Sequence, residues 1–318
     1  MQRSSEARKY KRGQSFDVHP AVNPDTPHAL PERINVVEIN AYAPRPFVFS
    51  ELALCLRDAL RRAGVASEHL INRSEPGVPS IVFVPTDGWE AFVAQLDPSD
   101  TVLFNMEQLG SDAPWTRDGY AESLKRWTVA DYNASNVAWL RRLNGEAQRV
   151  QEIPIVPGPS VAFAAPPSAD APADVLFFGT MNPRREQVVA QLREAGLTVE
   201  ALAGSFGWEL TPAILRARLV LHVHFYETRL FPVARILQPV AQGVPIVCES
   251  SVCSPLADWS AGSGIVFADT DRLVDTCREL LADPQRQLLS VQRSLRFAQQ
   301  MDITAPLRAL WAELDRPA

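Results

Sequence analysis

The sequence predicts an α/β protein built from two Rossmann-like domains that face each other across a cleft. The chain has 318 residues, and a single core seldom organises more than about 250 residues, so two domains are expected. Apolar, strand-like runs alternate with amphipathic, helix-like stretches, which is typical of parallel sheets covered by helices. A proline-rich segment near the middle of the chain divides this alternation into two halves.

The first half of the alternation begins at Ile34. Residues 34–40 have the pattern of a buried strand, and residues 49–64 have that of an amphipathic helix that ends at Gly64. Further strands are expected over residues 67–73, 80–85, 101–107 and 128–133, and further helices over residues 89–96, 120–127 and 135–143. We predict a first domain over residues 32–155, preceded by a loose polar arm, residues 1–31.

The second half follows prolines that recur from Pro154 to Pro172, and such a stretch supports neither a helix nor an interior strand. Residues 156–172 are therefore predicted to be a linker. Strands are then expected over residues 174–179, 197–203, 219–225 and 245–250, and helices over residues 182–196, 211–217 and 232–243. We predict a second domain over residues 173–303 and, over residues 304–318, a helix that packs back on the first domain.

Composition narrows the function classes. A formal net charge of −6 argues against a broad basic surface, so we expect no nucleic acid among the partners. No apolar run is long enough for a transmembrane segment. The four cysteines form no C-x-x-C pair and no disulfide-dense pattern, so the expected location is the reducing cytoplasm.

In an open parallel sheet, ligands bind beyond the carboxyl ends of the strands, where helix N-termini offer unpaired N–H groups. Gly179 directly follows an apolar strand, and Arg184 and Arg185 stand at the start of the next helix. The glycine would let a ligand approach the backbone, and the two guanidinium groups could hold a diphosphate. Alternatively, Gly179 only turns the chain and both arginines are solvated.

A second candidate group follows the strand at residues 219–225. His222 and His224 lie two residues apart and would point the same way from a strand, and Glu227 and Arg235 follow them. Imidazole and carboxylate together suit acid–base chemistry or pyrophosphate binding, whereas a histidine at a core edge also serves in structural hydrogen bonds. Two histidines without a third ligand do not predict a metal site.

Two more strand ends carry polar side chains. The strand at residues 245–250 ends in Glu249 and Ser250, and Ser251 follows it. These side chains could form hydrogen bonds with ribose hydroxyls or cap the next helix. Glu107 ends the strand at residues 101–107 in the first half, where an acceptor would lie. Its carboxylate could act as a general base for an incoming hydroxyl, or it could simply be satisfied at the core edge.

The runs DVLFFGTMNPRREQVVAQL and LVLHVHFYETRLFPVARILQPVAQGVPIVCESS resemble the C-terminal donor-binding domain of GT-B glycosyltransferases. The likeness is to the group 1, family 4-like type found in bacterial polysaccharide and spore-coat relatives. That type has a strand followed by glycine, then a basic residue, and a helix ending in A-x-G-x-P before a strand with an acidic residue. Ala241, Gly243, Pro245 and Glu249 match this pattern.

The resemblance implies a nucleotide diphosphate near Gly179, Arg184 and Arg185, and a sugar or ribose near Glu227, Arg235 and Glu249. Retaining members of the family carry two acidic residues where this chain has Leu230 and Gln238. The sequence therefore departs from the retaining pattern.

Together these features predict a glycosyltransferase that moves a sugar from a nucleotide diphosphate sugar to a glycan, small molecule or protein. Glu107, His224 and Glu227 are the expected catalytic residues. Arginines and a helix N-terminus would neutralise the departing diphosphate, so neither a metal nor a further cofactor is expected. The alternative is a non-catalytic protein that uses the same frame to bind a nucleotide or a partner. An enzyme using NAD or S-adenosylmethionine is disfavoured, because no G-x-G-x-x-G follows a strand.

Overall fold

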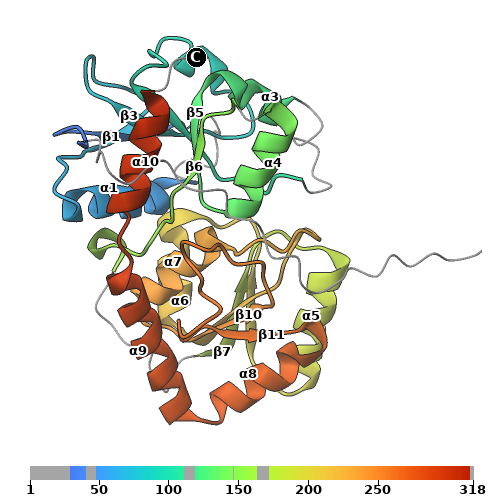
Figure 1. The fold of residues 1–318 in the computed structure, drawn as a ribbon. Coiled ribbons are helices and arrows are strands. Elements are labelled where there is room, and N and C mark those ends of the chain that lie inside the picture. Colours follow the sequence, from blue (N-terminus) through green and yellow to red (C-terminus); the bar gives the residue numbers. More distant parts are fainter. Residues whose placement is uncertain (1–28, 41–47, 111–118, 146, 163–171, 316–318) are drawn as a thin grey trace, which may run out of the picture.

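The computed structural model describes residues 29–40, 48–110, 119–145, 147–162 and 172–315. Within these residues the chain forms two lobes, one above the other in Figure 1, and each lobe is built on one parallel sheet. Most of the predicted N-terminal arm lies outside the described residues. No helix in the described part of the chain has the length and apolar character needed to cross a membrane.

The sheet of the first lobe has the strand order β2-β1-β3-β4-β5-β6, and every pairing is parallel. Its strands are β1 (Asn35–Glu38), β2 (His69–Ile71), β3 (Ser80–Phe83), β4 (Thr101–Asn105), β5 (Thr128–Asp131) and β6 (Val150–Glu152). The predicted strands are present, although most are shorter than expected. β6 was not predicted from the sequence, because its three residues, VQE, include a single apolar side chain and so form neither an apolar run nor an alternation.

The sheet of the second lobe has the order β11-β10-β9-β7-β8 and is also parallel throughout. Its strands are β7 (Ala173–Phe178), β8 (Val199–Leu202), β9 (Ala217–His222), β10 (Ile246–Glu249) and β11 (Val266–Ala268). β7 lies between β8 and β9, because the chain goes from β7 to β8 on one side and then crosses to β9 on the other. Such a switch point opens a crevice at the carboxyl ends of the two strands.

Helices cover both sheets. The first lobe contains α1 (Ser50–Arg62), α2 (Glu90–Val93), α3 (Tyr120–Ser123), η2 (Leu124–Arg126), α4 (Ala134–Asn144) and η3 (Pro159–Val161). The remaining helices are α5 (Pro183–Glu194), η4 (Gly207–Leu210), α6 (Thr211–Leu215), α7 (Val233–Ala241), η5 (Thr270–Arg272), α8 (Leu273–Leu281), α9 (Pro284–Gln300) and α10 (Thr304–Leu314). α9 runs alongside the second lobe, whereas α10 packs against β5 and β6 of the first (Figure 1).

One apolar cluster joins the lobes. It contains buried residues of α1, α7 and α10, among them Leu56, Leu237 and Trp311, and α1 contacts α7 directly. Burial of this shared apolar surface stabilises the lobes against each other.

The start of the proline-rich segment takes part in the same packing. Residues 153–158 are buried, η3 contacts both α1 and α7, and the Ser160 N–H donates to the Asp58 carboxylate over 2.8 Å. This part of the predicted linker is therefore held between the two lobes. Residues 163–171 lie outside the described residues, and the domain limits stay predictions.

Candidate functional site

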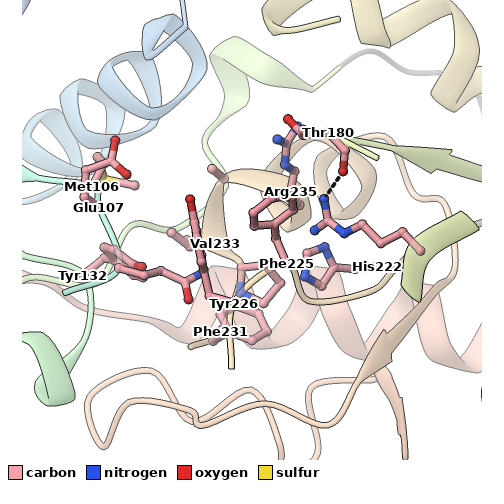
Figure 2. Close-up of a pocket in the computed structure, with 14 residues that line it drawn as sticks. Met106, Glu107, Tyr132, Thr180, His222, Phe225, Tyr226, Phe231, Val233 and Arg235 are labelled. Atoms are coloured by element: carbon pink, nitrogen blue, oxygen red, sulfur yellow. Dashed lines mark hydrogen bonds between the residues drawn. The ribbon is translucent and has the colours of Figure 1, made fainter. Parts of the chain in front are cut away.

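A cavity of about 390 Å³ lies between the two lobes. The first lobe lines it with residues that follow β4 and β5, and the second lobe lines it with residues after β7 and β9 and at the start of α7. In Figure 2, Met106, Glu107 and Tyr132 lie on one side of the cavity, and Thr180, His222 and Arg235 lie on the other. The carboxyl ends of the two sheets thus meet at one site, where ligands of open parallel sheets bind.

Two arginines converge on the backbone of Gly179. A Cβ atom at Gly179 would lie 3.3 Å from Nη1 of Arg185 and 3.7 Å from Nη2 of Arg235. Gly179 itself has φ +140°, a conformation that glycine adopts far more readily than other residues. The glycine predicted from the end of β7 is therefore the point at which both guanidinium groups approach the chain.

Arg185 is held firmly in this position. Its Nε and Nη2 donate to the carbonyl of Val223 over 3.0 and 2.6 Å, and its Nη1 donates to the carbonyl of Thr180 over 2.6 Å. The guanidinium also lies over the rings of Phe177 and Phe225, 5.5 and 5.1 Å from their centroids. Because carbonyls and aromatic faces carry no net charge, they orient the cation without neutralising it.

Arg235 is the second cation. It stands in the first turns of α7, with its guanidinium over the rings of Phe178 and Phe206 at 5.5 and 5.7 Å. Burial lowers the pKa of Arg185 to about 10, and burial also lowers the pKa of Arg235. Both groups still carry a positive charge at pH 7, so their end of the cavity suits an anion.

Arg184 differs from the expected arrangement. Its guanidinium pairs with the carboxylate of Glu249 and donates to the carbonyl of His224 over 2.9 Å, and it does not line the cavity. Glu249 is fully buried and also accepts from the Thr270 hydroxyl over 2.5 Å and from the His224 N–H over 2.8 Å. The Glu249 carboxylate is therefore fully engaged by groups of the protein itself. Of the two arginines predicted to bind a diphosphate, only Arg185 lines the cavity.

The two predicted histidines also differ in their positions. β9 ends at His222, so His224 lies beyond the strand, although the two rings contact edge to face at 4.9 Å. The Nε2 atom of His224 lies 2.8 Å from the Ser251 hydroxyl, and the ring does not line the cavity. Burial, followed by the charge of Arg184, lowers the pKa of His224 to about 3. His224 thus fits the structural alternative, whereas His222 lines the cavity.

The remaining predicted residues of the second lobe lie outside the cavity lining. Glu227 is exposed, and the Ser250 hydroxyl donates to the Asp269 carboxylate over 2.7 Å. The Ser251 hydroxyl is engaged with His224 and with the Glu249 carbonyl, 3.0 Å away.

Glu107 faces the cavity from the first lobe. Its backbone is fixed by the amides of Asn105 and Asn136, which donate to its carbonyl over 3.0 and 2.8 Å. Both amides also donate to the buried carboxyl group of Asp131. The Glu107 carboxyl group itself has no hydrogen-bond partner among the described residues, and burial raises its pKa to about 7. A carboxyl group with this pKa can take up or release a proton near neutral pH.

Several lining residues were not predicted from the sequence. Thr180, Phe225 and Tyr226 follow β7 and β9, whereas Gln108 and Tyr132 follow β4 and β5. The Thr228 hydroxyl donates to the side-chain oxygen of Gln108 over 2.8 Å and so links the two lobes near the cavity. All of these positions lie beyond strand ends, where ligands bind. They were not chosen because the sequence analysis favoured charged side chains at the strand ends.

Within the described residues, histidine, cysteine and acidic side chains do not gather in a group of three or more suited to holding a metal ion. The predicted independence from metals stays a prediction.

No model of a protein family matches the chain. Among curated proteins, it is 26% identical over 218 residues to uncharacterized protein L140 of Acanthamoeba polyphaga mimivirus, which spans 66% of this chain and 69% of that protein. It is also 24% identical over 139 residues to uncharacterized protein L138 of the same virus, which spans 43% of this chain and 16% of that protein.

Solved structures show the fold. An α-glucosyltransferase in complex with UDP and a DNA 13-mer matches with a TM-score of 0.55 at 12% identity, over 89% of this chain and 99% of that one. The phage T4 protein BGT, with UDP and Mn²⁺, matches with a TM-score of 0.56 at 10% identity, over 89% and 100%. HepE of Anabaena, with UDP and glucose, matches with a TM-score of 0.56 at 12% identity, over 87% and 98%. The chain therefore has the predicted GT-B fold, with two Rossmann-like domains that face each other.

Proposed function

We propose that this GT-B protein is a glycosyltransferase that moves a sugar from a nucleotide diphosphate sugar to a hydroxyl-bearing acceptor in the interlobe cavity. The observation that carries the proposal is the convergence of Arg185 and Arg235 at Gly179, opposite the carboxyl group of Glu107. The site thus offers positive charge on one side and a titrating carboxyl group on the other.

The arginine side suits the leaving group. When the glycosidic bond to a diphosphate breaks, the electron pair stays with the diphosphate, and its new negative charge must be stabilised. Arg185 and Arg235 carry fixed positive charges in a partly buried cavity, where such charges act more strongly than in water. Arg185 itself lies in the first turn of α5, where the Asn182 side chain accepts a hydrogen bond from its backbone N–H over 2.9 Å as the helix cap, so the positive end of that helix dipole is close by.

The opposite side suits the acceptor. An acceptor hydroxyl must lose its proton as it attacks the anomeric carbon, and Glu107 is the acidic side chain of the cavity lining. With a pKa of about 7, a large share of this carboxyl group is ionised at neutral pH and can accept that proton. We therefore assign Glu107 as the general base. His224 and Glu227 have no role in this scheme.

The class of acceptor is a further part of the proposal. The net charge of −6 favours a glycan, small molecule or protein over a nucleic acid. Two neighbouring α-glucosyltransferase structures contain DNA, so an assay of acceptors should include DNA beside the other classes. We also propose that the enzyme needs no metal and no cofactor besides the donor. Because its four cysteines are free, we propose a cytoplasmic location.

Calorimetry with UDP and GDP tests the donor site. We expect one nucleotide to bind to the unaltered protein, and we expect Arg185→Lys and Arg235→Lys each to weaken that binding about 10-fold or more. Lysine keeps the charge but loses the planar fork that holds a diphosphate with two parallel hydrogen bonds. Arg193→Ala is the matched control, because Arg193 lies exposed on the same helix as Arg185.

A hydrolysis assay separates an enzyme from a binding protein with the same frame. The purified protein is incubated with several nucleotide sugars, with EDTA or with Mn²⁺, and the released nucleotide is measured. Slow release that Arg185→Lys abolishes supports a transferase. Tight nucleotide binding without any release, with or without acceptors, would instead favour the non-catalytic alternative.

A further inference from the structure

His222 has an unsatisfied nitrogen in the wall of the cavity. The ring is 6% exposed, it lines the cavity beside Arg185 and Arg235, and its Nε2 atom has no hydrogen-bond partner among the described residues. Buried polar atoms are almost always paired in native proteins, so an unpaired one indicates a missing partner. In Figure 2 the ring lies on the same side of the cavity as Thr180 and Arg235.

A role in proton transfer does not fit this ring. Burial, followed by the neighbouring His224 ring and three guanidinium groups, holds the pKa of His222 well below its usual range. The groups that oppose its protonation are His224 beyond β9, Arg184 and Arg185 at the start of α5, and Arg235 on α7. An acid or base that works near neutral pH needs a pKa near neutral pH. His222 is therefore a neutral ring at working pH.

The neutral ring of His222 is better suited to binding a neutral group of a ligand than to binding its diphosphate. A neutral imidazole brings no charge, and the two adjacent guanidinium groups are stronger partners for phosphate oxygens. Guanidinium groups only donate hydrogen bonds, whereas a neutral imidazole has one N–H and one lone pair. The ring therefore adds a lone pair next to two guanidinium groups that can only donate.

We propose that His222 hydrogen-bonds, as a neutral ring, to a hydroxyl group of the carbohydrate part of the donor, next to the diphosphate held by the arginines. This inference rests on the proposed function. The hydroxyl belongs either to the transferred sugar or to the ribose, because both carry hydroxyls close to the diphosphate. It makes His222 a residue that selects for a hydroxylated donor rather than one that supplies charge.

The test compares His222→Leu and His222→Gln with the unaltered protein by calorimetry, using UDP-glucose, UDP, 2′-deoxy-UDP and inorganic pyrophosphate, or the guanosine series if GDP binds better. We expect His222→Leu to bind UDP-glucose about 5- to 30-fold more weakly, with pyrophosphate affinity unchanged. His222→Gln, which keeps a donor and an acceptor, should recover most of the affinity. A loss for UDP-glucose alone assigns the contact to the sugar. If His222→Leu also binds UDP more weakly, but binds 2′-deoxy-UDP as the unaltered protein does, the contact is to the ribose.

Melting temperature supplies the second readout. Without ligand, His222→Leu should melt no lower than the unaltered protein, because the substitution removes an unpaired buried nitrogen. A lower melting temperature together with equal losses for all four ligands indicates a purely structural ring and overturns the inference. Equal binding of UDP-glucose by His222→Leu, or a loss of pyrophosphate binding, overturns it too. An unaltered protein that binds no nucleotide refutes the proposed function itself.

Discussion

The side-chain amide of Gln238 on α7 donates a 2.5 Å hydrogen bond to the carboxyl group of Glu51 on α1, and so ties the two lobes together. The same amide donates to the carbonyl of Gly207 over 3.0 Å. Gln238 stands at a position where retaining relatives carry an acidic residue, and here a second carboxylate would lie against Glu51. The amide of Gln238 thus serves the contact between the lobes.

The carboxyl group of Glu51 should make stability depend on pH. Burial, reinforced by the nearby Glu38, raises the pKa of Glu51 from 4.5 to about 7 in the folded protein. Between these two pH values the folded state binds more protons than the unfolded state, so the contribution of Glu51 to stability falls as pH rises through this range. Glu51→Gln cannot ionise, and it should gain about 2–3 kcal/mol over the unaltered protein at pH 8, but little at pH 4.

Urea unfolding at pH 4, 6 and 8 measures this difference. Other buried carboxyl groups, such as that of Asp131, also have raised pKa values, so the relevant quantity is the gap between the two proteins rather than either curve. Glu122→Gln, at an exposed position, is the matched control. A gap of the same size at all three pH values would contradict the assignment to Glu51.

Gly179→Ala should damage the donor site more than the fold. The φ of +140° strains any residue with a Cβ by about 1–3 kcal/mol, and the new methyl group would lie 3.3 Å from Nη1 of Arg185. We expect a nucleotide affinity at least 10-fold lower, because the guanidinium must move away from the diphosphate. Thermal unfolding and calorimetry with UDP or GDP provide the two readouts.

Gly64→Ala is the control for backbone strain alone. Gly64 has φ +83°, and a Cβ there would meet nothing within 4 Å. Its substitution should lower the melting temperature but leave nucleotide affinity unchanged. If both variants bound nucleotide as the unaltered protein does, the close approach at Gly179 would have no functional meaning.

Glu107→Gln should slow transfer without weakening nucleotide binding. The amide cannot accept the acceptor's proton, and loss of a general base lowers rates by about 10²- to 10⁴-fold. In the unaltered protein, kcat/KM should rise with pH up to about 7, as Glu107 loses its proton, and this rise should be missing from the variant. Initial rates between pH 5.5 and 8.5 measure both effects. Transfer by Glu107→Gln at the unaltered rate would assign proton removal to another group.

The sequence was sufficient for the frame of the molecule. The regular alternation of strands and helices gave two parallel sheets, and the strand-end rule led from β7 to Gly179 and from β9 to His222. The fold prediction is confirmed because it depends on backbone topology, which hydrophobic periodicity largely determines. The roles of Gly179 and His222 stay predictions. β6 has one apolar residue, Val150, so no apolar pattern marked it and it was missed.

Side-chain directions could not be predicted in the same way. Arg184 and Arg185 are adjacent on one helix and therefore point in different directions, so only Arg185 reaches the cavity, while Arg184 pairs with Glu249. His224 was expected to share a strand face with His222, but the strand ends before it. Which polar group faces a ligand and which satisfies a neighbour depends on tertiary contacts far apart in the sequence, such as the 65 positions between Arg184 and Glu249.

The course of the last two helices has a practical consequence for work on this protein. Because α9 runs along one lobe and α10 packs on the sheet of the other, the polypeptide passes between the lobes a second time after the proline-rich segment. A fragment that ends after the second sheet would leave the apolar surface beneath Leu307, Leu310 and Trp311 open to water. Expression of either half by itself should therefore give aggregating material, and the two halves are best produced as one polypeptide.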